Sequence, residues 1–302
     1  MGARRATRDV RSRRTETADE ALRRLLAEQF AVIAKNEPRA ATGSVEALHD
    51  IRVALRRMRS LALTFWKLAP DFLESLDKRA SKVCDRMGNA RDLDVWIELF
   101  RGLAQADGGR KIAVRDGRAV LAALKRARTR AAAEALSCGI FRRTKKMLRE
   151  FLRRRPTVRG KKTPARERFA ARRMLAVRWL VEERYRRVGN FSKNAAHDLR
   201  RAGRRMRYLA EFFAPWLGRD CVRAGKWIAK AQAALGKVHD CDSALEFTKE
   251  LPTGTARSAV RRALKKRRAA QLRKFKAAWR RYADRRLQKA FRARLEAAAG
   301  RA

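Results

Sequence analysis

The feature that most constrains the fold is an internal repeat. Residues 49–65 read HDIRVALRRMRSLALTF, and residues 197–213 read HDLRRAGRRMRYLAEFF. The same register continues without a gap over about fifty positions, from Ser44 and Ser192 to Glu98 and Glu246. A repeat of this kind indicates a duplicated structural unit. We therefore expect two similar lobes rather than one irregular domain.

Composition favours helices throughout. Alanine, leucine and arginine dominate the sequence, and all three are good helix formers. Hydrophobic residues make up 46% of the 302 residues, which is enough to build a core. The predicted fold class is therefore all-α, with two pseudo-symmetric helical bundles.

A basic N-terminal stretch and a charged segment with two prolines and a glycine suggest the boundaries. We expect a disordered basic arm over residues 1–17, an N-terminal helical lobe over 18–152, a linker over 153–168 and a C-terminal helical lobe over 169–302. No uncharged apolar run reaches the length of about 18 residues that a membrane span needs, and the N-terminus lacks a secretory signal. These features favour a cytoplasmic protein.

Each copy of the repeat predicts the same helices. Ser44 should cap a helix that runs to about Leu68, and its counterpart should start at Ser192 and stop before Pro215. A second helix is expected over 71–87, with a break or kink at Gly88, and a third from about Asp92. Long basic helices, each with an interruption, are expected over 110–152 and 256–299.

The first repeat helix has two distinct stripes. An apolar stripe should pack into the bundle, and it comprises Leu48, Ile51, Leu55, Met58, Ala62 and Phe65. Beside it, His49, Arg52, Arg56 and Arg59 fall at angles of about 0°, −60°, −20° and −80° around the helix. The second copy repeats this basic stripe as His197, Arg200, Arg204 and Arg207.

The basic stripes point to an anionic ligand. The chain has 78 Lys+Arg against 31 Asp+Glu, a formal net charge of +47. Like charges three and four residues apart destabilise a helix, and the sequence shows no carboxylates in the row to neutralise them. Arginine binds phosphate oxygens through a planar fork. Successive residues of the stripe are about 4.5–6 Å apart along the helix axis, a spacing that suits an extended phosphate polymer.

The motif resembles that of a known family. H-D-[IL]-R-x-A-x-R-R-M-R, followed by GNARDLD in the first half and GKVHDCD in the second, is similar to the CHAD domain, the conserved histidine α-helical domain. The resemblance covers about residues 18–300. It implies two helical bundles that share a basic central groove, binding of inorganic polyphosphate, and association with polyphosphate or other storage granules.

The resemblance also implies site residues. The polyphosphate contacts expected from it are His49, Arg52, Arg56, Arg59, Lys82, His197, Arg200, Arg204, Arg207 and Lys230. Arg91 and His239 occupy equivalent positions but differ in type, so neither is assigned to the site. The E-x-E-x-K motif of the triphosphate-tunnel domain that often accompanies CHAD is absent from the sequence.

Other chemistries have weaker support. No phosphate-binding glycine loop or zinc-ligand spacing is present, so we expect no catalytic residue, cofactor or metal. Asp92/Asp94 and Asp240/Asp242 could hold Mg²⁺ for a polyphosphate-processing enzyme, but capping and salt bridges to arginine are the favoured roles. Non-specific nucleic-acid binding is the main alternative function, because charge alone does not distinguish phosphate polymers.

Overall fold

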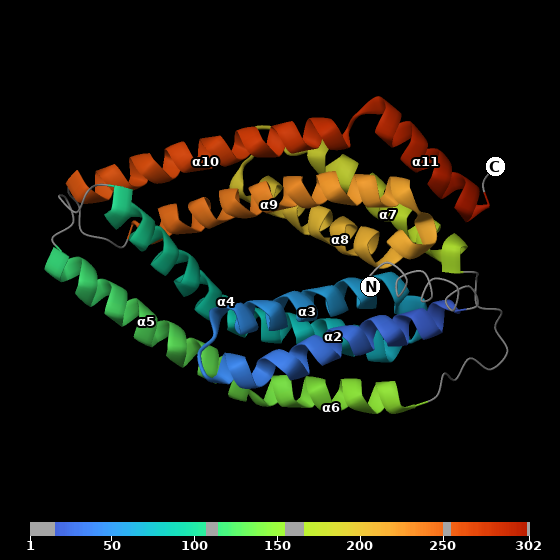
Figure 1. Cartoon of the computed structure of the whole chain (residues 1–302), viewed down its shortest axis with the longest axis horizontal. Coiled ribbons are helices and arrows are strands. Elements are labelled where there is room, and N and C mark those ends of the chain that lie inside the picture. Colours follow the sequence, from blue (N-terminus) through green and yellow to red (C-terminus); the bar gives the residue numbers. More distant parts are fainter. Residues whose placement is uncertain (1–15, 107–113, 155–165, 250–254, 301–302) are drawn as a thin grey trace, which may run out of the picture. The chain divides into compact units, whose positions relative to one another are not determined.

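The computed structural model is almost entirely helical where it describes the chain, which is over residues 16–106, 114–154, 166–249 and 255–300. Within these ranges there are ten α-helices, one short 3-10 helix and no strand (Figure 1). The helices are α2 (Ala18–Ala41), α3 (Val45–Phe65), η2 (Trp66–Leu68), α4 (Pro70–Ala106), α5 (Val114–Ser137), α6 (Gly139–Arg153), α7 (Arg166–Arg186), α8 (Lys193–Leu217), α9 (Arg219–Phe247), α10 (Thr255–Tyr282) and α11 (Arg285–Ala299). The predicted all-α class is confirmed.

The chain divides into two compact units. The N-terminal unit comprises Leu22–Arg155 and Phe247–Arg262, and the C-terminal unit comprises Met1–Ala21, Pro156–Glu246 and Ala263–Ala302. Within the N-terminal unit, Phe247 stacks on Trp96 with ring centroids 4.1 Å apart. The expected basic groove between the lobes stays a prediction.

The predicted arm and linker lie mostly outside the described residues, which exclude 1–15 and 155–165. Thr17 and Glu20 form a capping box at the start of α2. The Glu20 carboxylate accepts from the Thr17 backbone N–H at 2.7 Å, and the Thr17 hydroxyl accepts from the Glu20 N–H at 3.3 Å. At the other end of the predicted linker, α7 has already begun at Arg166.

The apolar stripe of the first repeat helix forms the core of the N-terminal unit. All six residues predicted for the stripe are buried, and α3 packs along α4, whose Leu73, Leu76, Val83 and Met87 are buried as well. In the C-terminal unit α8 packs on α7, and α11 packs on α7 in turn. The four cysteines are free and buried.

Two predicted helix ends are wrong. The break at Gly88 does not occur, because α4 runs without interruption from Pro70 to Ala106 and includes the helix expected to start near Asp92. Similarly, α8 continues through Pro215 to Leu217 and ends at Gly218, whose φ of 79° is left-handed. Pro215 removes one backbone hydrogen bond of the helix, and burial of Trp216 and Leu217 beyond it offsets this cost.

The long basic helices are interrupted as expected. The first is divided at Cys138 into α5 and α6, and the second between Tyr282 and Arg285 into α10 and α11. Asp284 caps α11 by accepting from the Leu287 N–H at 3.0 Å. None of the helices in the described ranges has an apolar window long enough to cross a membrane.

Candidate functional site

In the N-terminal unit, the basic stripe lies where α3 packs on α4. Ser44 starts α3 by accepting from the Ala47 N–H at 3.2 Å, which fixes the direction of the helix. Along α4, Asp77, Cys84 and Arg91 are seven residues apart and therefore share one side of that helix. This side faces the stripe. We call His49, Arg52, Arg56, Arg59 and Arg91 the N-terminal seam.

Positive charges in the N-terminal seam affect one another. Burial lowers the pKa of His49, and the cations Arg56 and Arg91 lower it further. Burial also lowers the pKa of Arg52, with a further contribution from Arg56. Burial raises the pKa of the Cys84 thiol, although Arg52 and its neighbours on the stripe oppose that shift. The seam therefore concentrates cations in a partly desolvated place.

Two arginines of this seam retain unused donors. The Nε atoms of Arg52 and Arg56 are buried and donate no hydrogen bond within the part of the chain that the structure describes. A buried donor without an acceptor is unfavourable, more so when the group is charged. An anion that supplied oxygens here would satisfy both donors and relieve the repulsion between the two guanidinium groups.

The far end of each stripe has a carboxylate partner, which corrects the expectation that the rows are unneutralised. Arg59 donates from Nε to Asp77 of α4 at 2.7 Å. Arg207 lies 3.6 Å from Glu211, one turn further along α8. Asp77 lies on another helix, so the periodicity of α3 could not indicate this partner. Part of the positive charge of each stripe is therefore neutralised within its own unit.

The C-terminal unit has an equivalent arrangement on α8 and α9. We call His197, Arg200, Arg204, Arg207 and His239 the C-terminal seam. The imidazole rings of His197 and His239 are 5.9 Å apart between centroids. Burial lowers the pKa of His239 to about 4, with further contributions from Arg200, His197, Arg204 and Lys193. Burial and Arg200 lower the pKa of His197 as well.

Arg91 and His239 are the residues that sequence reasoning left out. The two positions differ in residue type between the copies, and for that reason neither was assigned to the site. Because α4 and α9 continue through Gly88 and Gly236, both residues stay in line with the helix face that packs on α3 or α8. The equal offset of the two positions in the repeat was the signal that could have identified them.

Lys82 and Lys230 lie apart from the seams. Each is nine residues before Arg91 or His239, which places it about 180° around the same helix. Both lysines are exposed. The Lys230 ammonium lies 4.5 Å from the centre of the Trp227 ring and borders a separate groove between α9 and α10.

The second aspartate of each D-x-D pair holds an arginine from another helix, which is buried in the first copy and half-buried in the second. Asp94 accepts from Arg128 Nε at 2.9 Å, and Arg128 also donates to the Gly43 carbonyl at 2.7 Å. In the second copy, Asp242 accepts from Arg268 at 2.6 Å, and Arg268 donates to the Phe191 carbonyl at 3.0 Å. We call these contacts the arginine clamps.

The clamps decide between the two favoured roles of these aspartates. All four lie inside continuous helices, so the expected capping role is wrong, whereas the expected salt bridges to arginine are present at Asp94 and Asp242. Each clamp ties its aspartate to the residue just before the N-cap serine of α3 or α8. Among the described residues, no group of three or more acidic, histidine or cysteine side chains is arranged to hold a metal ion.

Known proteins share this architecture. The family model for the CHAD domain matches residues 24–249. The crystal structure of the CHAD domain from the plant Ricinus communis is 26% identical to this chain, with a TM-score of 0.63 and coverage of 93% of this chain and 92% of that one. PptA from Streptomyces chartreusis is 18% identical, with a TM-score of 0.67 and coverage of 88% of this chain and 100% of that one, a likeness of fold. A search of curated proteins found no match. Since the family model spans both copies of the repeat and both seams, the chain belongs to the CHAD domain family.

Proposed function

We propose that this protein binds inorganic polyphosphate non-covalently through its two seams. The observation that carries the proposal is the pair of buried, unused Nε donors on Arg52 and Arg56, beside a histidine and Arg91. The second copy of the repeat brings His197, Arg200, Arg204 and His239 together in the same way. Membership of the CHAD family supports the same ligand class.

The geometry of a seam suits a polymer of phosphate. Successive stripe residues rise by about 4.5–6 Å along the helix, so the row offers a donor to one phosphate group after another. Guanidinium groups contact two oxygens at once and stay charged at any physiological pH. A single small phosphate would need only one such cluster, whereas each unit holds a row.

The same surfaces offer little to a nucleobase. Proteins that bind single-stranded nucleic acid stack bases on exposed aromatic rings. Apart from the histidines, neither seam contains an aromatic residue, and the nearest aromatic along α8, Tyr208, is fully buried. Nucleic acid remains the alternative ligand, because its backbone phosphates can neutralise the same cations.

Charge reversal within a seam tests the proposal. We expect Arg52→Glu with Arg56→Glu to weaken binding of long-chain polyphosphate by at least about tenfold, because hydrogen bonds to charged groups contribute about 1.5–3 kcal/mol each. The matched control is Arg142→Glu with Arg143→Glu, which makes the same change in net charge at exposed positions of α6. Equal loss of affinity in both variants, each still helical by circular dichroism, would show that binding depends on net charge alone.

Competition at physiological salt separates the two polymers. Labelled polyphosphate is challenged with duplex DNA and single-stranded RNA at equal phosphate concentration. We expect polyphosphate to be the stronger competitor by at least about tenfold. Equal competition by DNA would favour the nucleic-acid alternative.

We further propose that the protein is not an enzyme and that it acts in the cytoplasm, at polyphosphate or other storage granules. The non-catalytic role is tested by measuring phosphate release from polyphosphate with Mg²⁺ or Mn²⁺. Release that disappears in Asp92→Asn and Asp240→Asn variants would contradict it and support a processing enzyme. Imaging of the tagged protein against stained granules tests the location.

A further inference from the structure

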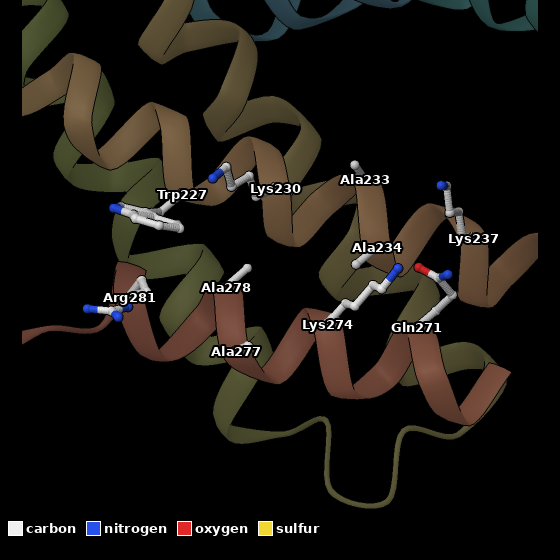
Figure 2. A pocket seen from close by; sticks show the side chains of 10 residues that line it. All are labelled: Trp227, Lys230, Ala233, Ala234, Lys237, Gln271, Lys274, Ala277, Ala278 and Arg281. Carbon is white, nitrogen blue, oxygen red and sulfur yellow. The ribbon is translucent and has the colours of Figure 1, made fainter. Parts of the chain in front are cut away.

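A second basic surface lies within the C-terminal unit, in the groove between α9 and α10. Figure 2 shows the ten side chains that line it, which are Trp227, Lys230, Ala233, Ala234, Lys237, Gln271, Lys274, Ala277, Ala278 and Arg281. The groove has a volume of about 490 Å³, within the range of about 300–1,000 Å³ that is typical of small-molecule sites. It is distinct from the C-terminal seam, and the proposed polyphosphate contacts do not explain it.

Sequence spacing accounts for the hollow. The lining residues follow the same spacing on both helices, starting from Trp227 on α9 and from Gln271 on α10. A lysine comes three residues later, two adjacent alanines follow it, and a lysine or arginine ends the row. The helices run antiparallel here, with Trp227 and Arg281 at one end and Lys237 and Gln271 at the other (Figure 2). Because alanine ends at Cβ, the four alanines leave an apolar floor between two rows of longer side chains.

The charge of the groove favours a polyvalent anion. Four of its lining residues are cations, Lys230, Lys237, Lys274 and Arg281, and none of the ten is acidic. The cations lie at both ends, and the two ends are about 15 Å apart because ten residues of helix separate the outer lining residues. An elongated anion would meet positive charge along its whole length.

Two further side chains indicate more than a charged surface. Trp227 is half-buried at one end, and Lys230 covers one face of its indole. At the other end Gln271 is only 8% exposed, and Figure 2 shows its amide pointing into the groove. A phosphate oxygen in the groove would accept a hydrogen bond from this amide.

We propose that this groove binds a nucleoside di- or triphosphate. The base lies over the alanine floor against Trp227, and the phosphate chain extends toward Lys274, Lys237 and the amide of Gln271. Indole rings stack on any base, and the Gln271 amide can donate to a phosphate oxygen. Inorganic polyphosphate would satisfy the cations but leave the apolar floor and Trp227 unused, which is why a nucleotide fits better.

Calorimetric titration with three probes tests this site: adenosine triphosphate, inorganic tripolyphosphate and adenosine. The chain used carries Arg56→Gln and Arg204→Gln, so that binding at the seams does not mask the groove. We expect adenosine triphosphate to bind about fivefold to a hundredfold more tightly than tripolyphosphate, the contribution of one stacked base. Trp227→Ala should abolish this difference, and Trp227→Phe should keep part of it.

Controls separate the groove from general charge and from the seams. Lys274→Ala should weaken both phosphate ligands, whereas Trp179→Ala, at an exposed tryptophan of α7 outside the groove, and Lys289→Ala should change neither. In the otherwise unchanged chain, Trp227→Ala should leave binding of long-chain polyphosphate as it was, so the two proposals fail separately.

Two outcomes would overturn the inference. One is equal affinity for adenosine triphosphate and tripolyphosphate, or a parallel loss of both in Trp227→Ala, which would reduce the groove to a generic anion surface. The other is a single-stranded oligonucleotide that binds more tightly than adenosine triphosphate with the same dependence on Trp227. In that case the occupant would be a nucleic-acid strand rather than a nucleotide.

Discussion

Among single residues, the arginine clamps are expected to matter most for stability. Asp94 and Arg128 are only 8% and 6% exposed at their side chains, and burial raises the pKa of Asp94 although Arg128 opposes the shift. Removing one member leaves the other charge buried and unpaired. We therefore expect Arg128→Met to lower the free energy of unfolding by about 3–5 kcal/mol, as measured by urea denaturation.

The second clamp provides the comparison. Arg268 and Asp242 are 23% and 13% exposed, so water screens the charge that a substitution would leave behind. Arg268→Met should destabilise the protein by less than Arg128→Met. Equal effects, or no effect of Arg128→Met, would show that burial does not determine the role of these pairs.

His239 should couple ligand binding to protons. Its pKa of about 4 in the folded chain is below the ordinary value of 6.5, owing to burial and to Arg200, His197, Arg204 and Lys193. The unfolded chain therefore binds more protons between about pH 4 and 6.5, and the stability of the free protein should fall as pH falls through this window. A bound polyanion offsets the neighbouring cations and raises the pKa of His239, so polyphosphate affinity should increase as the pH falls through the same window.

Calorimetry in buffers with different ionisation enthalpies measures the proton uptake that accompanies binding. His239→Gln should reduce this uptake while it leaves binding at about pH 8 nearly unchanged, because the imidazole is neutral there. Uptake that is the same in His239→Gln and the parent chain would show that His239 is not affected by the ligand.

For whole elements, the periodicity of the sequence predicted which faces of a helix are apolar and basic. It did not predict the helix lengths or the partners on other helices, because these depend on packing. The spacing of apolar and basic residues identified both faces of α3, because one helix contains the entire pattern. Gly88 was interpreted as a break because glycine weakens a helix, but the buried residues along α4 maintain it on both sides. Asp77 and Arg128 could not be assigned, since each acts on a helix far away in sequence.

Glycine substitutions test the continuity of α4 and α9. A Cβ at Gly88 or Gly236 would meet no heavy atom within 4 Å, so alanine at either position should raise the free energy of unfolding by about 0.5–1 kcal/mol. Gly225→Ala is the matched control in α9, because its Cβ would lie 2.9 Å from that of Ala210 and should destabilise the chain. Destabilisation by Gly88→Ala would indicate a break at that position after all.

At the scale of the whole molecule, a net charge of +47 opposes the compact state. Added salt should therefore raise the Tm of the free protein by screening this repulsion. Polyphosphate should raise the Tm through binding to the folded state, by about 2.7 kcal/mol at a hundred times Kd, or roughly 4 °C for a chain of this size.

Salt should raise the Tm of the free protein but reduce the further increase that polyphosphate produces. This opposite dependence on salt distinguishes specific neutralisation of the seams from a general effect of any solute. As salt rises, counterions screen the seams and weaken binding of the polymer, so the increase in Tm produced by polyphosphate should shrink while the Tm of the free protein climbs. Thermal unfolding is followed across a salt series with polyphosphate, with the same concentration of phosphate as orthophosphate, and with neither. Because orthophosphate cannot bridge successive arginines of a row, its increment should be much smaller at every salt concentration. An increment from polyphosphate that does not change with salt would mean that the ligand acts elsewhere than on these charges.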